Sequence, residues 1–222
     1  MKGRAVVLII LFLVVCDQAL KIYVKTHFHE GDLHPVIGNW FNLYFLENEG
    51  MAYGWEFGGN WGKLILTLFR LGAVIFGIFY LRKIVQKGYH KGFIICASLI
   101  FAGALGNLLD SMFYGLIFDQ GTSQHLSVLF PPHGYAGFLH GKVVDMLYFP
   151  VIRDAHFPAW VPKWGGERFE FFRPIFNIAD ASISTGVISI LLFQKRFFHP
   201  RDKVHSRTIE TSALVNDEMQ VS

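Results

Sequence analysis

The chain has 222 residues, of which 52% are hydrophobic, 16% aromatic and only 17% charged, a balance that excludes an ordinary solvated domain and indicates a membrane protein. The formal net charge of +3 is too small, and the basic residues are too scattered, to indicate nucleic-acid binding. Cys16 and Cys96 both lie inside apolar runs, where a free thiol behaves as a small hydrophobic side chain.

Four apolar stretches reach the length of about 20 residues that a helix needs to cross the hydrocarbon core of a bilayer. The first follows Lys2 and Arg4 as a secretory signal would, but no small-x-small cleavage site follows it, so we expect it to be retained. The predicted transmembrane helices are residues 5–24, 62–81, 92–114 and 174–193.

Four crossings place both termini on one side of the membrane. Basic residues are dense on that side: two precede the first helix, four lie in the connection 82–91, and five follow the last helix. The segments on the opposite side, 25–61 and 115–173, are much longer and hold six. By the positive-inside rule we predict that both termini are cytoplasmic and that the two long segments lie outside.

The outer segments predict a small cap on the helices. The run 40–46 has the aromatic, partly alternating texture of a strand and leads to turn residues at 48–50, which predicts a small outer β-sheet. The segment 115–173 is rich in Phe, Trp and Tyr, so we expect it to lie at the headgroup level. Without repeats or linkers, residues 1–199 are predicted to form one mainly α membrane domain with a small extracytoplasmic β-sheet and a surface loop cap, and residues 200–222 a polar cytoplasmic tail.

Polar residues of the predicted helices gather near their outer ends. Asp17 and Lys21 are four apart in the first helix, where a structural ion pair is the better single explanation. Asn107 and Asp110 are three apart in the third helix, so the amide is expected on the same face as the acid, where it can orient the carboxylate. The same spacing and expectation apply to the fourth helix, at Asn177 and Asp180.

Asp145 is a further carboxylate in an apolar frame, and we expect it in the loop that leads into the last helix rather than in a buried strand. Two carboxylates at a partly dry site, Asp145 and Asp180, cannot both ionise easily, so one keeps its proton. This is the arrangement of an aspartyl hydrolase, in which the ionised acid takes a proton from water while the protonated acid hydrogen-bonds the substrate carbonyl. The residues alone leave a hydrolase and a structural or ion-path role open.

Other chemistries have weaker patterns. The chain has ten His but no His-Glu-x-x-His or Cys-x-x-Cys, so no metal site and no cofactor are predicted. No Gly-x-Ser-x-Gly occurs, which disfavours nucleophilic catalysis. The main alternative is a small proton-coupled transporter or channel subunit, but a proton relay should run through the full membrane depth, whereas these acids cluster at one end. A structural scaffold is a third reading, in which Asn could replace the acids with little consequence.

Five motifs in order resemble those of lipoprotein signal peptidase, the type II signal peptidase family of bacteria. Each is weak alone, but together they are specific and cover nearly the whole chain short of the tail. The motifs are Asp17-Gln18-Ala19-Leu20-Lys21, Asn48-Glu49-Gly50-Met51-Ala52-Tyr53-Gly54, Gly103-Ala104-Leu105-Gly106-Asn107-Leu108-Leu109-Asp110, Val143-Val144-Asp145 and Phe176-Asn177-Ile178-Ala179-Asp180-Ala181-Ser182.

The resemblance implies a four-helix aspartyl endopeptidase of the bacterial cytoplasmic (inner) membrane, active near the outer face. It would remove the signal peptide of prolipoproteins just before the diacylglyceryl-modified cysteine, with Asp145 and Asp180 as the catalytic pair. It further implies contact with membrane lipid and binding of globomycin-like cyclic peptide inhibitors, and we expect a monomer. The residues implied to line, support or brace the site are Asn48, Gly50, Asn107, Asp110, Asn177, Ala179, Asp17 and Lys21.

Two features depart from the family. Ser111 stands where the family usually has Arg after the acid of the third helix, and the stretch 115–140 is longer than the family's connector. Arg70 lies inside the second predicted helix, where an unpaired charge is costly. We hypothesise that Arg70 turns toward the bundle and supplies the missing positive charge, with Asp110 as the candidate partner; the alternative is that its side chain extends to the outer interface.

Overall fold

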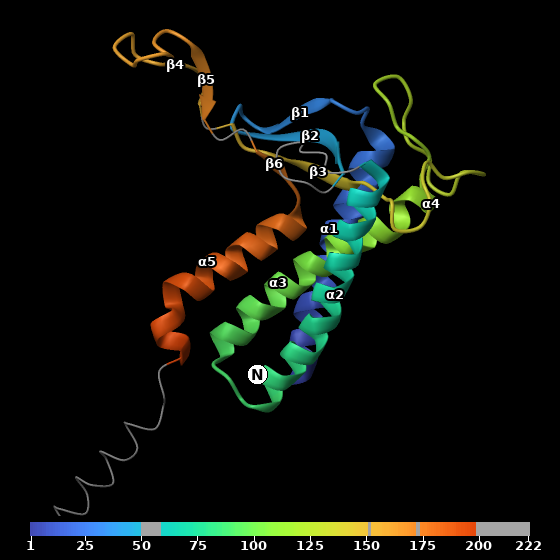
Figure 1. Cartoon of the computed structure of the whole chain (residues 1–222), viewed down its shortest axis with the longest axis vertical. Helices are drawn as coiled ribbons and strands as arrows, with labels where there is room; N and C mark the ends of the chain where they lie inside the picture. Colours follow the sequence, from blue (N-terminus) through green and yellow to red (C-terminus); the bar gives the residue numbers. More distant parts are fainter. Residues whose placement is uncertain (50–58, 151, 172–173, 199–222) are drawn as a thin grey trace, which may run out of the picture.

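The computed structural model describes residues 1–49, 59–150, 152–171 and 174–198. Four long helices make up most of the described chain, and all four are long and apolar enough to cross a membrane. Figure 1 shows the N-terminus, the α2–α3 connection and the end of α5 at one end of the molecule. The helices are α1 (Gly3–His27), α2 (Gly59–Gln86), α3 (Lys91–Leu109) with its continuation η2 (Asp110–Tyr114) and α4 (Gly115–Ile117), and α5 (Ile178–Phe198).

The four predicted transmembrane helices are confirmed, although α2 and α5 each end five residues later than predicted. Two further differences lie at the helix ends near the sheet. The third helix changes at Asp110 to π-helical hydrogen bonding, a rare form that occurs frequently at functional sites. The last helix begins at Ile178, four residues later than predicted, because residues before it form a short strand. Gly50 and the tail 200–222 lie outside the described residues.

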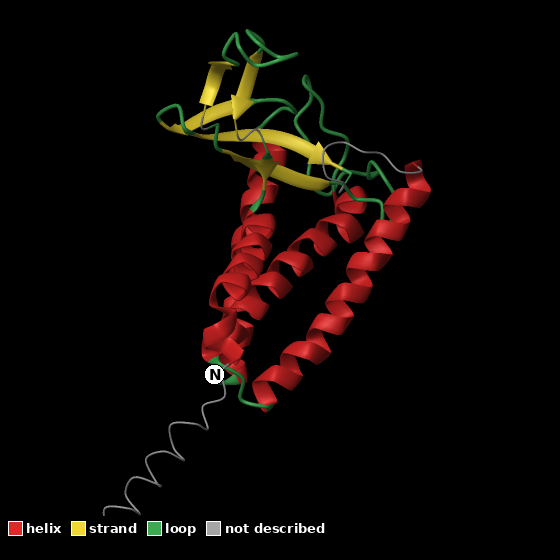
Figure 2. Cartoon of the chain, turned by 60° about the vertical axis from the view of Figure 1, so that its left-hand side comes forward, coloured by secondary structure: helices red, strands yellow, loops and turns green. Residues whose placement is uncertain are grey.

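A four-stranded antiparallel sheet lies over the ends of the helices that are opposite the N-terminus (Figures 1 and 2). The strand predicted within 40–46 is confirmed as β2. The expectation that Asp145 lies in a loop is wrong, because it lies in β3, an inner strand of this sheet. In spatial order the strands are β1 (Leu33–Ile37), β2 (Phe41–Asn48), β3 (Val143–Tyr148) and β6 (Ile175–Phe176).

The pairing of β2 with β3 places Asn48 beside Asp145. Asn48 lies opposite Val143, and Val143 and Asp145 share one face of β3 because they are two residues apart. Asn48 is therefore a diagonal neighbour of Asp145 on that face. The opposite face of β3 presents Val144 and Met146 to a buried cluster.

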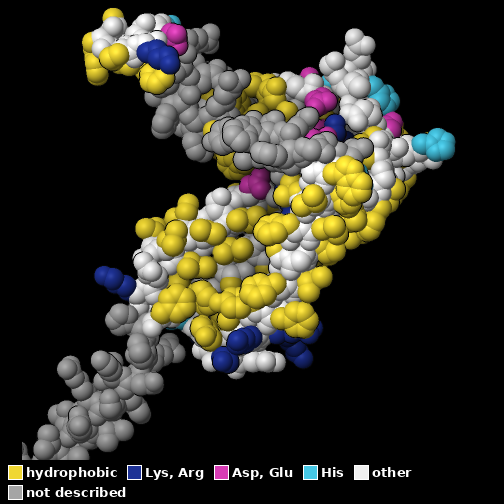
Figure 3. All heavy atoms as spheres, in the orientation of Figure 1, with side chains coloured by type: hydrophobic (Ala, Val, Ile, Leu, Met, Phe, Trp, Pro, Cys, Tyr) yellow, Lys and Arg dark blue, Asp and Glu magenta, His cyan; other side chains and the backbone are white. Residues whose placement is uncertain are grey.

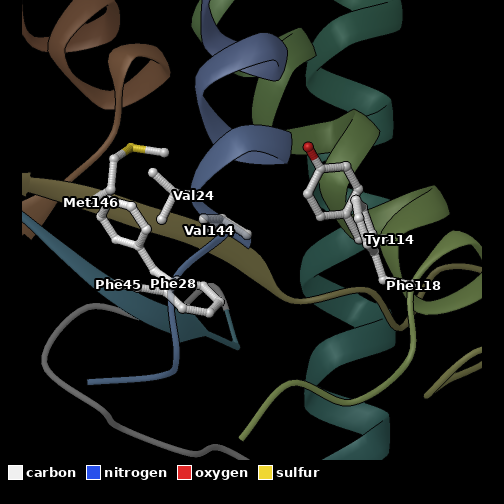
Figure 4. Packing of buried hydrophobic residues seen from close by; sticks show 7 residues of the cluster. All are labelled: Val24, Phe28, Phe45, Tyr114, Phe118, Val144 and Met146. Atoms are coloured by element: carbon white, nitrogen blue, oxygen red, sulfur yellow. The ribbon is translucent and has the colours of Figure 1, made fainter. Parts of the chain in front are cut away.

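This buried cluster joins the sheet to the helices (Figure 4). The end of α1 and the residue after it supply one residue each, β2 and β3 together supply three, and the region from η2 to the residue after α4 supplies two. Contacts from both layers fix the sheet over the helix ends and hold β3 through the face that carries Val144 and Met146. The cluster consists of Val24, Phe28, Phe45, Tyr114, Phe118, Val144 and Met146.

The second outer segment contains a further hairpin, β4 (Ile152–His156) and β5 (Arg168–Phe171). Figures 1 and 2 show this hairpin extending away from the helices, beyond the four-stranded sheet. The expectation that this segment lies at the headgroup level stays a prediction. Its connecting loop carries the exposed Trp160 and Trp164.

Hydrophobic side chains cover the outward faces of the helices (Figure 3). Phe12, Phe69 and Leu192 are 68%, 73% and 73% exposed, values typical of side chains that face lipid rather than water. Lys and Arg gather at the end of the molecule opposite the sheet, while most of the visible acidic side chains lie near the sheet. The chain is thus a multi-pass membrane protein.

Close packing of α3 against the start of α5 depends on glycine. A Cβ on Gly103 would lie 2.2 Å from the carbonyl oxygen of Ala179, and one on Gly106 would lie 2.7 Å from Asp17 Oδ2. Both distances are far below van der Waals contact, so neither position admits a side chain without movement of the backbone or of Asp17. The Gly-x-x-Gly spacing of α3 thereby determines how closely Asp180 can approach α3.

Gly103→Ala is expected to destabilise the folded protein by about 1–3 kcal/mol, because the new methyl group meets the backbone of α5. The measurement is the thermal unfolding midpoint in detergent. Gly72→Ala is the matched control, since a Cβ at Gly72 in α2 meets nothing within 4 Å. There the change is expected to be neutral or stabilising by up to about 1 kcal/mol. Equal midpoints for both variants would contradict this account of the α3–α5 contact.

Candidate active site

Asp180 is held in the first turn of α5 by a capping box. The Asp180 N–H donates to Asn177 Oδ1 at 2.9 Å, and the Asn177 N–H reaches back to Asp180 Oδ2 at 3.4 Å. This reciprocal pair is typical of a helix N-terminus. Asn177 therefore precedes the helix, and its closeness to Asp180 comes from the cap rather than from a shared helix face.

Asp145 is buried, with only 3% of its surface exposed, and both of its oxygens accept hydrogen bonds from amides. Asn177 Nδ2 donates to Asp145 Oδ1 at 2.7 Å, and Asn48 Nδ2 donates to Asp145 Oδ2 at 3.0 Å. Asn177 thus contacts both acids, one through its side-chain amide and the other through the cap. The structure brings Asp145 and Asp180, 35 positions apart in the sequence, into one site.

Asn107 of α3 completes the amide frame of the site. Its Nδ2 donates to Asp180 Oδ1 at 2.8 Å, and its Oδ1 accepts from Asn177 Nδ2 at 3.2 Å. The expectation that Asn107 orients Asp110 on its own helix is therefore wrong. Asp110 points instead toward α1, because η2 begins at this residue and its side chain pairs with Lys21.

The environment of Asp145 favours its protonated form. Burial raises the pKa of Asp145 to about 7, and the nearby carboxylate of Asp180 acts in the same direction. Hydrogen bonds from Asn48 and Asn177 oppose the shift, since they stabilise the carboxylate. Near neutral pH this pair can therefore hold one proton, as acid–base hydrolysis requires.

Lys21 lies at the centre of the bundle and contacts three of the supporting residues. Its buried Nζ lies 2.8 Å from Asp17 Oδ2, 2.6 Å from Asp110 Oδ2 and 2.9 Å from Asn107 Oδ1. Asp17 Oδ1 in turn accepts the N–H of Ala179 at 2.9 Å. The predicted Asp17–Lys21 pair is confirmed, and it also connects α1 to α3, η2 and the start of α5.

Two further residues belong to this network although the sequence analysis did not select them as site residues. Gln18 Nε2 donates to Asp110 Oδ1 at 2.7 Å, and the Tyr114 hydroxyl donates to Gln18 Oε1 at 3.1 Å. Gln18 follows Asp17 inside the first of the five motifs, and that motif is the sequence signal that indicates it. Tyr114 gave none, because an aromatic residue in a transmembrane helix is ordinary.

Arg70 turns toward the bundle, as hypothesised, and its Nη1 donates to Ser111 Oγ at 2.8 Å. Ser111 in turn donates to the carbonyl oxygen of Asn107 at 3.0 Å. The contact falls on the residue that stands where the family usually has Arg. Among the described residues, no group of three or more His, Cys, Asp or Glu is placed to hold a metal ion.

The predicted site residues thus meet in two connected layers, except Gly50, which lies outside the described residues. Asp145, Asp180 and three asparagines form the first layer. Asp17, Lys21 and Asp110 form the second, which braces Asn107 and the start of α5. The arrangement can activate water between two carboxylates whose positions are held by amides.

Comparison with known proteins gives consistent results. Residues 9–196 match the family model described as Signal peptidase (SPase) II. A lipoprotein signal peptidase of Porphyromonas gingivalis is 48% identical over 197 residues, covering 88% of this chain and 84% of the relative. Another, of Amoebophilus asiaticus, is 33% identical over 212 residues, covering 93% of this chain and 85% of the relative.

Two solved structures share the fold. Both are described as bacterial membrane enzymes solved by the in meso method. One is 25% identical with a TM-score of 0.55, and the match covers 90% of this chain and 94% of the other. The second is 27% identical with a TM-score of 0.53, covering 86% of this chain and 92% of the other.

Proposed function

We propose that Asp145 and Asp180 form the catalytic pair of this chain, which belongs to the signal peptidase II family. The chain functions as a lipoprotein signal peptidase, a membrane protease. A proton-coupled transporter finds no support, since the family model and the named relatives are peptidases and the matching structures are membrane enzymes.

The observation that carries the proposed roles is the shared contact of both acids with Asn177. Asp145, whose pKa lies near 7, holds the proton at rest and donates a hydrogen bond to the scissile carbonyl oxygen. Asp180 is the ionised partner and takes a proton from the attacking water. When the tetrahedral intermediate collapses, Asp180 gives its proton to the leaving amine, and the pair returns to one proton.

The proposed substrate is a prolipoprotein whose cysteine carries diacylglycerol, cleaved just before that cysteine. The acids lie where the helix ends meet the sheet, so the acyl chains can stay in lipid while the peptide reaches the site. We further propose the bacterial inner membrane as the location, with cytoplasmic termini, an outward-facing site and contact with lipid. Inhibition by globomycin-like cyclic peptides and a monomeric state belong to the same proposal.

The test is cleavage by the purified protein of one prolipoprotein in two forms, with and without the diacylglyceryl group. The proposal predicts rapid cleavage of the lipidated form, a product that begins with the modified cysteine by mass spectrometry, and inhibition by globomycin. Equal cleavage of both forms, or cleavage at another bond, would contradict the substrate assignment.

The catalytic efficiency kcat/KM is expected to fall as the pH rises through about 7, approaching tenfold per unit above it. The pKa of Asp145 is raised from 3.8 to about 7, so its proton is retained below pH 7 and lost above it. The same shift makes the free energy of unfolding decline between about pH 4 and pH 7, because the buried acid binds its proton more tightly when folded. Initial rates between pH 5 and pH 9 check this, and a profile flat to pH 9 would refute it.

A further inference from the structure

A polar stripe runs along one face of α2, a helix that contributes none of the five motifs. Lys63, Thr67 and Arg70 are spaced four and three apart, so they share that face. The other faces of α2 carry exposed hydrophobic side chains such as Phe69. An amphipathic pattern of this kind inside a transmembrane helix indicates that the polar face lies toward the protein interior.

Each residue of the stripe holds a different segment of the site. Lys63 Nζ donates to the carbonyl oxygen of Glu49, which follows Asn48, at 2.7 Å. Thr67 Oγ1 donates to the carbonyl oxygen of Leu139, in the loop before β3, at 3.0 Å. Arg70, through Ser111, reaches the helix that carries Asn107.

Arg70 differs from the other two because its charge acts on the acids themselves. Its guanidinium interacts electrostatically with Asp180, Asp110 and Asp145. Ser111 fixes the direction of the guanidinium, and Ser111 is itself anchored on the carbonyl of Asn107, whose amide holds Asp180. A short chain of hydrogen bonds therefore connects Arg70 to the carboxylate that we propose as the ionised partner.

Lys21 is not available as the sole counter-charge of the catalytic pair, so a second cation can take part in this role. The ammonium of Lys21 lies within 3 Å of both Asp17 and Asp110, so its charge is already shared between two carboxylates. Lys63 faces the carbonyl of Glu49 and lies within electrostatic range of Arg70, Asp110 and Lys142. The charged groups that act on the pair are Lys21 of α1 and Arg70 of α2, and the two acids also act on each other. Asp17 of α1 and Asp110 of η2 are paired with Lys21, and Lys63 of α2 interacts with Glu49, Asp110 and Lys142.

We propose that Arg70 is a positioning residue for the catalytic pair: anchored by Ser111, its guanidinium supplies the fixed positive charge that keeps one of the two acids ionised. It acts through the acids and not on the substrate. The inference rests on the proposed function, because it assigns a role toward Asp145 and Asp180 as a catalytic pair.

The test is the pH profile of kcat/KM for Arg70→Gln. Removing a nearby positive charge raises carboxyl pKa values. Both the acid limb and the alkaline limb of the pH profile are therefore expected to move to higher pH by about one unit. On the acid side this shift gives a roughly tenfold loss of kcat. KM is expected to change less than kcat, since the proposal assigns Arg70 a role toward the acids and not toward the substrate. Arg70→Lys keeps the charge and is expected to restore the position of both limbs.

Ser111→Ala provides a second variant that keeps the guanidinium but removes its anchor. A smaller shift in the same direction is expected, and it serves as the test if Arg70→Gln does not fold. A uniform loss of rate with unmoved limbs, or no change at all, in a folded variant would overturn the inference. The wild-type protein separates the two claims. If it does not cleave lipidated prolipoprotein, the proposed function fails. If it does cleave, but the pH profile of the variants stays where it is in the wild type, only the role of Arg70 is refuted.

Discussion

Asp145→Asn and Asp180→Asn are each expected to lower the rate of prolipoprotein cleavage by about 10³-fold or more. An amide can neither hold the proton that polarises the scissile carbonyl nor take one from water. The shape of the side chain is kept, and its amide oxygen can still accept one of the two hydrogen bonds that each acid accepts. The measurement is initial rate on a lipidated prolipoprotein.

Asp32→Asn is the matched control for these variants. Asp32 lies on the outer segment, is partly exposed and accepts the N–H of His29 at 2.8 Å, which an amide oxygen can also do. Its rate is expected to stay within about twofold of wild type, as for surface changes in general. A folded Asp145 or Asp180 variant with full activity would instead support a scaffold role for the replaced acid.

Lys21→Met is expected to produce the largest loss of stability, about 3–5 kcal/mol. The ammonium is fully buried between Asp17 and Asp110, so its removal leaves two carboxylates in the bundle without their cation. The predicted result is a large drop in the thermal unfolding midpoint in detergent, together with poor recovery of folded protein. Activity should fall as well, because Lys21 also holds Asn107.

Neutralising the partners provides the control for Lys21→Met. The triple variant Lys21→Met, Asp17→Asn, Asp110→Asn buries no net charge at this position and is expected to regain most of the lost stability. Lys2→Met makes the same change at an exposed position near the start of α1 and should leave the midpoint unchanged. If the triple variant were as unstable as Lys21→Met, unpaired charge would not explain the loss.

The transmembrane helices could be predicted because their signal is local. Length and apolarity alone define a crossing, and the structure differs from the prediction only in where the helices begin and end. The start of α5 moved to Ile178 because the capping box of Asn177 and Asp180 ends the preceding strand. A capping box was readable in the sequence as Asn-x-x-Asp, but the continuous apolar texture suggested an earlier helix start.

The strand β3 could not be predicted in the same way. Its residues Val143 to Met146 are all buried, so the alternation that indicates a half-exposed strand is missing. A short apolar run of this kind does not distinguish a strand from a connecting segment. The prediction that Asp145 lies at the same end of the helices as Asp180 is nevertheless confirmed, because it depends on counting crossings and not on local structure.

The partners of the site residues were the least predictable feature. Spacing along α3 suggested that Asn107 serves Asp110, yet Asn107 donates to Asp180, 73 positions away. Which acid an amide meets depends on how α3 packs against α5, and that packing depends on Gly103 and Gly106. Sequence spacing along one helix contains no information about a neighbouring helix, so the cross-helix bonds required the structure.

The measurement that tests the central claim most directly is the cleavage rate of the double variant Asp145→Asn, Asp180→Asn compared with each single variant. If the two acids act as one unit on one water molecule, each single change already removes the mechanism. The double variant should then be no slower than the slower single variant. Losses that multiply, so that the double variant is slower by the product of the two single effects, would contradict a shared catalytic pair.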